Sequence, residues 1–305
     1  MNSINLGEPL VSVVIPTYKR PDHLSRAIES VLGQSYPNVE VYVVDDNNPD
    51  TEDRKLTEET MRIYDDNPRV KYLKHEKNKN GSAARNTGAR ASKGDYIAFL
   101  DDDDEYTPIR IESMLKRFAD LPSEYGICYS RYISRMPDGK EIKSKENREG
   151  DLFKVALMKD LVFGSGSNNL VKREAYNAIG GYDESFRRNQ DHEFMIRLLQ
   201  KYKIGYCDEL GLIIHVHFEK RNVSIEETLG HYVETFKPIV ETLSEQDQKQ
   251  FYKKVNLNYF VHYFRTEHNY KKAWNLVSQR KISYGDALGT LWSGAIKMIK
   301  RKIKK

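Results

Sequence analysis

The sequence has few cysteines and no long apolar run. Its 305 residues include two cysteines, Cys128 and Cys207, which form no CxxC pair. This excludes a disulfide framework and a cysteine-based zinc site, and we expect both thiols to be buried as small apolar groups. No apolar run approaches the roughly 20 residues that span a bilayer. The start, MNSINLGEPL, lacks the basic residues and apolar core of a signal peptide, so we expect a cytoplasmic protein.

Excess charge is also missing from most of the chain. The formal net charge is +4, but the last nine residues, KMIKRKIKK, hold six of the 49 Lys and Arg residues and no acid. The other 43 basic residues face 45 acidic ones. A nearly neutral body argues against an extended nucleic-acid surface, so we expect no nucleic-acid partner. The basic character belongs to the C-terminal tail.

Several motifs that bind nucleotides or metals are absent as well. No GxxxxGK[ST] loop is present, and GSGSNN at 164–169 lacks the third glycine of a dinucleotide fingerprint. HEKNK and HEFMI each lack the second histidine of a zincin. Four consecutive aspartates, Asp101 to Asp104, follow an apolar run, but Tyr106 stands where an EF-hand loop requires glycine. These four like charges repel each other unless water or a cation accommodates them.

The hydrophobic pattern predicts alternating strands and helices. The β-branched runs LVSVVIPTY and VEVYVVDDNN are typical of strands buried on both faces, and residues 21–32 follow helical spacing between them. Helices over 53–64 and 82–92 alternate with further strands ending at 75 and 104. This order indicates an α/β fold with a mainly parallel sheet flanked by helices. From Ser224 the pattern is helical, which predicts a C-terminal helical extension.

Three predicted strand ends contain polar side chains. Parallel sheets bind ligands outside the carboxyl ends of their strands, so adjacent ends would form one acidic site. Carboxylates at such a site suit Mg²⁺ or Mn²⁺. The alternative interpretation of the aspartate run is a solvated acidic turn before the helix that Pro108 begins. The residues concerned are Pro16, Thr17 and Tyr18 after the first strand, Asp45, Asp46 and Asn47 after the second, and Asp101 to Asp104.

Three segments together resemble a known family. They are VSVVIPTYKRPDHLSRAIESVLGQSYPNVEVYVVDDNNPD, GSAARNTGARASKGDYIAFLDDDDEYTP and GGYDESFRRNQDHEFMIRL. In this order they look like the signature blocks of family 2 inverting glycosyltransferases of the GT-A fold. The resemblance implies a Rossmann-like GT-A domain over residues 1–223, with a nucleotide-binding half at about 10–108 and an acceptor half at about 109–223. Residues 224–305 would follow as a helical region with a basic amphipathic tail.

The resemblance also implies roles for the first two strand ends. Thr17 and Asp46 match residues that hold the nucleotide base, usually uracil, with Pro16, Tyr18 and Asp45 beside them. An aspartate can accept the N3–H of uracil. The alternative for both aspartates is a solvated turn.

Arg85 and the aspartate run match the phosphate and metal positions of the family. The resemblance places Arg85 near the nucleotide, whereas a surface arginine is the alternative. The run matches the metal-binding DxD, so Mn²⁺ or Mg²⁺ is the expected cofactor. Two registers of this match fit, Asp101 with Asp103 or Asp102 with Asp103. Asp103 is the expected metal ligand with Asp102 as the candidate second ligand, and Asp102 or Asp101 would touch ribose and sugar. Asp104 is expected to be a solvated neighbour.

Asp191 falls on the family's catalytic-base position, although Gln190 replaces the usual preceding acid. An inverting transfer needs a carboxylate to remove the acceptor hydroxyl proton. A helix N-terminal aspartate is the alternative, and His192 and Glu193 are runner-up bases. The GSGSNN segment would border donor sugar or acceptor, or be a flexible loop. His215 and His217 alternate on a strand and therefore share a face. We expect both to be core or hydrogen-bonded histidines, and the alternative is that one of them is a metal ligand.

The expected function is therefore that of a metal-dependent inverting hexosyltransferase. It would move a sugar from a nucleotide donor, UDP-linked in this family, to a saccharide or lipid-linked oligosaccharide during cell-surface polysaccharide synthesis. Alternatives are a sugar-phosphate nucleotidyltransferase and a non-catalytic membrane-tethered binding module. The tail predicts a basic amphipathic helix on the cytoplasmic face of a membrane, with a packed helix and frayed end as alternative. Its apolar positions are Leu288, Trp292, Ala295, Ile296, Ile299 and Ile303.

Overall fold

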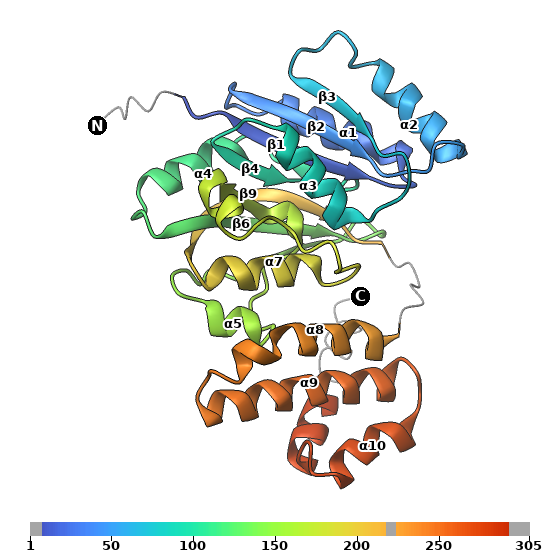
Figure 1. The fold of residues 1–305 in the computed structure, drawn as a ribbon, viewed down its shortest axis with the longest axis vertical. Coiled ribbons are helices and arrows are strands. Elements are labelled where there is room, and N and C mark those ends of the chain that lie inside the picture. Colours follow the sequence, from blue (N-terminus) through green and yellow to red (C-terminus); the bar gives the residue numbers. More distant parts are fainter. Residues whose placement is uncertain (1–7, 218–223, 293–305) are drawn as a thin grey trace. The chain divides into compact units, whose positions relative to one another are not determined.

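The computed structural model describes residues 8–217 and 224–292. The chain divides between residues 219 and 220 into two compact units (Figure 1). The predicted positions Ala295, Ile296, Ile299 and Ile303 lie outside the described residues. Both cysteines are free and buried, as expected.

The first unit is built on a single twisted sheet (Figure 1). Its spatial order is β3-β2-β1-β4-β8-β6-β9-β5, with β7 paired to β6. The strands are β1 (Val11–Thr17), β2 (Val39–Asp45), β3 (Val70–Lys74), β4 (Tyr96–Phe99), β5 (Glu105–Tyr106), β6 (Tyr125–Arg135), β7 (Glu141–Lys143), β8 (Asn169–Lys172) and β9 (Lys203–His215).

The predicted parallel arrangement is present where the first strands meet. β1 pairs in parallel with β2 on one side and with β4 on the other, and β2 pairs in parallel with β3. β8 runs antiparallel to both β4 and β6, while β6 and β9 form a second parallel pair. The three neighbouring strands β2, β1 and β4 therefore end at the same edge of the sheet.

Helices cover both faces of this sheet. The helices of the first unit are α1 (Pro21–Leu32), α2 (Glu52–Arg62), α3 (Gly81–Ala91), α4 (Arg110–Ala119), α5 (Phe153–Leu157), α6 (Arg173–Ala178) and α7 (Gln190–Leu199), with a short 3₁₀ turn at Gly166–Asn168. Alternate side chains of β1 point to opposite faces. Ile15 belongs to the core cluster that includes Leu24 of α1. Val14 faces α3, where a Cβ on Gly88 would lie 2.4 Å from its Cγ1, so glycine permits the close contact.

The second unit is helical, as the pattern after Ser224 predicts. It contains α8 (Ile225–Val240), α9 (Glu245–Arg265) and α10 (Tyr270–Ser278), and residues 284–292 are also helical. Its core includes Phe260, which packs edge-on against Trp274. Among the described helices, none combines the length and the apolar character needed to cross a bilayer.

Candidate active site

The three polar strand ends are brought together at one edge of the sheet. Thr17, the last residue of β1, is the register partner of Asp45 at the end of β2. On the other side, the Thr17 hydroxyl donates a 2.8 Å hydrogen bond to Asp102 Oδ2, just beyond β4. The backbone N–H of Tyr18 approaches the same oxygen at 3.4 Å. Since β1 lies between β2 and β4, Thr17 links the two acidic segments.

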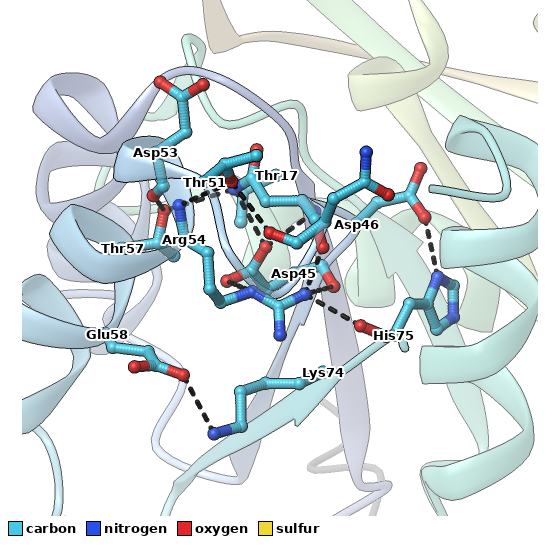
Figure 2. Close-up of polar contacts among 12 residues, drawn as sticks. Thr17, Asp45, Asp46, Thr51, Asp53, Arg54, Thr57, Glu58, Lys74 and His75 are labelled. Carbon is cyan, nitrogen blue, oxygen red and sulfur yellow. Dashed lines mark hydrogen bonds and ion pairs between the residues drawn. The ribbon is translucent and has the colours of Figure 1, made fainter. Parts of the chain in front are cut away.

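Asp45 points toward α2 and is completely enclosed (Figure 2). Oδ1 accepts bonds from the backbone and side-chain amides of Asn47, both at 2.9 Å. Oδ2 accepts from the Tyr72 hydroxyl at 2.6 Å and faces Arg54 Nε at 2.9 Å. Burial raises the pKa of Asp45, and all of these partners oppose the rise. The protein itself therefore compensates this carboxylate, with three hydrogen bonds and one ion pair.

Asp46 points the other way, toward the start of α3 (Figure 2). Its Oδ1 accepts from His75 Nδ1 at 2.7 Å and from the backbone of Lys79 at 2.8 Å. Its Oδ2 accepts from the Asn78 side chain at 2.8 Å and from the Asn80 backbone at 2.9 Å. Asp46 thus fixes the loop that precedes α3. The solvated-turn alternative is wrong for both aspartates, since each is at most 2% exposed.

The four consecutive aspartates lie in four different environments. Asp101 is partly exposed, whereas Asp102, Asp103 and Asp104 are 5%, 8% and 2% exposed. The expectation that Asp104 is a solvated neighbour is therefore wrong. Its Oδ2 accepts a 2.7 Å bond from Ser167 and its Oδ1 a 3.2 Å bond from the His215 backbone. The compact turn after β4 buries it, with its own amide bonded to the Asp101 carbonyl.

Burial and repulsion between the aspartates both raise the pKa values of the carboxylates at this turn. Burial is the main cause that raises the pKa of Asp102, to about 7, and neighbouring aspartates raise it further. The pKa of Asp103 is raised by burial and Asp101, and that of Asp104 is raised well above its usual value by burial, Asp101 and Asp103. Arg20 forms an ion pair with Asp103 and lies 3.7 Å from Asp102 Oδ1. The turn is therefore short of positive charge.

The residues at this turn fit a hard divalent cation. One carboxylate oxygen from each of Asp101, Asp103 and Asp104 lies within 4.8 Å of the others. Oxygen ligands in such a group are what Mg²⁺ and Mn²⁺ prefer. Asp102 instead bonds Thr17, so the geometry favours Asp101 and Asp104 as the neighbours of Asp103 in a metal shell.

The two histidines on the last strand differ in their partners. His215 Nε2 lies 3.0 Å from Glu105 Oε1, which makes it a hydrogen-bonded histidine. His217 Nε2 lies 3.5 Å from Asp103 Oδ2, and its ring stacks on His23 with centroids 5.6 Å apart. Both histidines therefore lie beside the acidic turn, His215 through its backbone N–H to Asp104 and His217 through its imidazole near Asp103.

Arg85 of α3 connects the acidic turn to α7. It is 6% exposed, so the surface-arginine alternative is wrong. One guanidinium nitrogen bonds Asp101 Oδ1 at 2.5 Å and another bonds Gln190 Oε1 at 2.9 Å. Its guanidinium also lies over the Tyr182 ring, 5.4 Å from the centroid. Through Gln190, Arg85 therefore connects the start of α7, where Asp191 follows, to Asp101 of the acidic turn.

Asp191 lies in the first turn of α7 against the GSGSNN segment. A Cβ on Gly166 would lie 2.5 Å from Asp191 Oδ1, so only glycine leaves room for this carboxylate. Burial raises the pKa of Asp191, Arg85 opposes this rise, and Asp101 adds to it. Oδ1 is buried and has no hydrogen-bond partner among the described residues. The carboxylate therefore retains an acceptor position.

Sequence reasoning did not assign two residues at this site. Arg20, in the segment after β1, supplies positive charge to Asp103. Ser167 of the GSGSNN segment bonds both Asp104 and the backbone N–H of Asp101. The available signals were the cations of YKR directly after a strand end and the hydroxyls of the glycine-rich segment. That segment is buried at residues 166–168 rather than forming a flexible loop.

Comparison with known proteins decides the family. Residues 12–180, more than half of the chain, match the profile described as glycosyl transferase family 2. The chain belongs to glycosyl transferase family 2. It is therefore a glycosyltransferase, as expected, and this result favours transfer over the sugar-phosphate nucleotidyltransferase and binding-module alternatives.

Curated glycosyltransferases are similar to this chain over most of its length. The sequence is 38% identical over 224 residues to the putative colanic acid biosynthesis glycosyl transferase WcaA of Escherichia coli K12, covering 72% of this chain and 76% of that one. It is 26% identical over 244 residues to an uncharacterized glycosyltransferase of Haemophilus influenzae, covering 74% and 78%.

Solved structures of another protein share the fold. S. aureus TarS 1–349, crystallised with UDP-GlcNAc, matches with a TM-score of 0.63 at 15% identity, over 85% of this chain and 74% of that chain. This likeness confirms the expected GT-A fold. Another TarS structure is matched over 44% of its chain, with a TM-score of 0.62.

Proposed function

We propose that this family 2 enzyme transfers a sugar from a UDP-linked donor to a hydroxyl acceptor, with inversion and with Mn²⁺ or Mg²⁺ as cofactor. The observation that supports it best is the adjacency of Thr17, the acidic turn and Asp191 at one sheet edge, linked through Arg85 and Gln190. Donor, metal and base would then meet within a single site.

The donor base would bind beside the ends of β1 and β2. Tyr18 offers a 41% exposed ring for stacking, and Pro16 and Thr17 border the same edge. The structural neighbour TarS was crystallised with UDP-GlcNAc, which supports a nucleotide-sugar donor. Since Asp46 already accepts four bonds, it would act by ordering the Asn78 to Asn80 loop, and it accepts N3–H only if one of these bonds opens.

The metal would be held by Asp103 together with Asp101 or Asp104. When bound, such a cation stabilises the negative charge that grows on the leaving diphosphate. Arg85 lies beside Asp101 and is buried, so its guanidinium adds fixed positive charge to the same region. Asp102, bonded to Thr17, would face the ribose side.

Asp191 would act as the general base. Its free Oδ1 can accept the acceptor hydroxyl proton as that oxygen attacks the anomeric carbon and the diphosphate leaves from the opposite face. Arg85 opposes the rise in the pKa of Asp191 that burial and Asp101 cause. The runner-up bases are less suitable. Burial lowers the pKa of His192 to about 4, and Glu193 pairs with Arg197.

The acceptor would be a saccharide or a lipid-linked oligosaccharide of cell-surface polysaccharide synthesis. Similarity to WcaA, named for colanic acid biosynthesis, supports this class. Work on a lipid-linked acceptor would place the enzyme on the cytoplasmic face of a membrane as a peripheral protein.

A panel of nucleotide sugars with Mn²⁺ or Mg²⁺ tests the proposal. We expect one or more UDP-sugars to raise the melting temperature and to be hydrolysed or transferred only with the metal. Asp191→Asn should lower turnover by about 10² to 10⁴ while UDP binding is kept. Asp66→Asn, on an exposed turn, is the matched control. No response to any UDP-sugar, or normal turnover in Asp191→Asn, would contradict the donor or the base respectively.

A further inference from the structure

The last described helical segment has an exposed apolar side. Residues 284–292 are helical, and Tyr284, Leu288 and Trp292 follow at intervals of four, so they lie along one side of the helix. Their exposed fractions are 66%, 55% and 71%. Ala287, on a neighbouring side, is fully buried in the core of the second unit. We call the three exposed residues the apolar ridge.

Two residues of the ridge border the same hollow. Leu288 and Trp292 line it with Gly289 and Leu291, its volume is about 560 Å³, and these four described residues have apolar side chains or none. At the other end, Tyr284 stacks on Trp274 with centroids 5.9 Å apart, which fixes its ring. Exposed apolar surface that is clustered in this way marks a contact site.

The charge distribution identifies the partner. The segment 297–305 begins five residues after Trp292 and contains six Lys or Arg residues and no acid, whereas the rest of the chain is nearly balanced. Clustered cations next to apolar side chains match a surface that is negatively charged outside and apolar beneath. Tryptophan and tyrosine are the residues that favour this boundary in a bilayer.

We propose that the apolar ridge inserts into the interfacial layer of an anionic phospholipid membrane, while the cations of 297–305 bind its headgroups. The ridge alone would bind a neutral bilayer weakly, and the cations alone would bind without insertion. Together they form the two signals that stable membrane attachment requires. This attachment is independent of the donor, the metal and the base proposed above.

Tryptophan fluorescence tests the proposal directly. The chain has two tryptophans, so Trp274→Phe leaves Trp292 as the only reporter and retains an aromatic ring in the core. We expect its emission to shift to the blue with vesicles of phosphatidylcholine and phosphatidylglycerol at physiological salt. Pure phosphatidylcholine should give little shift. Replacing the six cations of 297–305 by glutamine should remove the response to the anionic lipid.

Sedimentation of the full chain with the same vesicles supplies a second measurement that needs no tryptophan substitution. Leu288→Ser should lower the bound-to-free ratio about tenfold, because a large apolar side chain leaves the lipid. Ile63→Ser, which removes a 74% exposed apolar side chain from the first unit, is the matched control and should change nothing.

Three results would overturn the proposal. The first is the absence of binding to anionic vesicles, and the second is equal binding by the wild type and Leu288→Ser. The third is a blue shift without lipid that depends on protein concentration, because it would mean that the ridge contacts a second copy of the chain. Sugar transfer to a soluble acceptor should be unchanged in Leu288→Ser. Failure of membrane binding is therefore distinguishable from failure of the proposed enzymatic function.

Discussion

Two acidic regions lie at the same edge of the sheet, and they differ in how their charge is compensated. At the end of β2, the Asp45 carboxylate accepts three hydrogen bonds and forms an ion pair with Arg54. The Asp46 carboxylate accepts four hydrogen bonds, one of them from His75 (Figure 2). After β4, burial raises the pKa values of Asp102, Asp103 and Asp104, and neighbouring aspartates, Asp101 among them, raise all three further. The first region is complete without a ligand, whereas the second needs additional positive charge.

This difference separates a structural role from a binding role. Every neighbouring group that affects Asp45 lowers its pKa, so the folded protein supplies its own counter-charge. At Asp103, Arg20 and His217 oppose the rise, but Asp101 adds to it. A buried group of like charges is costly unless a cation joins it. We therefore expect substitutions in the first region to change stability and substitutions in the second to change activity.

The largest effect is expected from Asp103→Asn. Loss of a metal ligand should lower sugar transfer with Mn²⁺ by about a hundredfold or more. The free energy of unfolding without metal should change by only about 1 kcal/mol, because the lost ion pair with Arg20 is offset by relief of repulsion from Asp101. Initial rates and urea denaturation measure the two quantities. A large loss of stability with normal activity would reverse the assignment.

The opposite outcome is expected for Asp46→Asn. The asparagine amide would face N–H donors that now bond a carboxylate, including His75 Nδ1 and the Asn80 backbone. Leaving such buried donors unsatisfied should cost about 3 kcal/mol of unfolding free energy. Urea denaturation without ligand is the measurement, with exposed Asp66→Asn as the control. Unchanged stability would show that Asp46 does not fix the loop before α3.

The effect of Mn²⁺ on stability should depend on pH. The pKa of Asp102 is about 7 in the folded protein and near 3.8 when unperturbed. Between these values the folded state binds more protons than the unfolded chain, so the acidic turn makes stability fall as pH rises from about 4 to 7. A bound cation removes this penalty. Mn²⁺ should therefore raise the melting temperature more at pH 7.5 than at pH 5, by on the order of 3 °C.

Thermal unfolding at both pH values, with a chelator as reference, measures this difference. If Mn²⁺ raised the melting temperature equally at the two pH values, or not at all at pH 7.5, the cation would not be bound by the acidic turn.

The smallest expected effect tests how complete the first region is. Tyr72→Phe removes one of the bonds to Asp45 Oδ2 and keeps the ring. The remaining partners, Asn47 and Arg54, still compensate the charge. The loss of unfolding free energy should be about 1 kcal/mol, with sugar transfer unchanged. A loss of several kcal/mol of unfolding free energy would mean that Asn47 and Arg54 cannot compensate the Asp45 charge without Tyr72.

Most of the first sheet could be predicted from the sequence, because β-branched runs define β1 and β2 and the order of strands and helices implies parallel pairing. The joining of three polar strand ends followed from that arrangement. The opposite directions of the Asp45 and Asp46 side chains also agree with strand geometry, because successive side chains along a strand point to opposite faces of the sheet.

The individual environments of Asp101 to Asp104 could not be predicted in this way. Four identical residues give no pattern, and their partners come from distant segments. Ser167 buries Asp104, and Arg85 of α3 bonds Asp101. Only the packing of these segments around the turn makes the aspartates different, which is why a residue expected to be solvated is among the most buried.

Calorimetric titration of Mn²⁺, with UDP present, is the most direct test of the central claim that the acidic turn after β4 holds the cation. We predict one Mn²⁺ per chain in the wild type and in Asp66→Asn, and loss of this binding in Asp103→Asn. Equal Mn²⁺ affinity in the wild type and in Asp103→Asn would contradict the account.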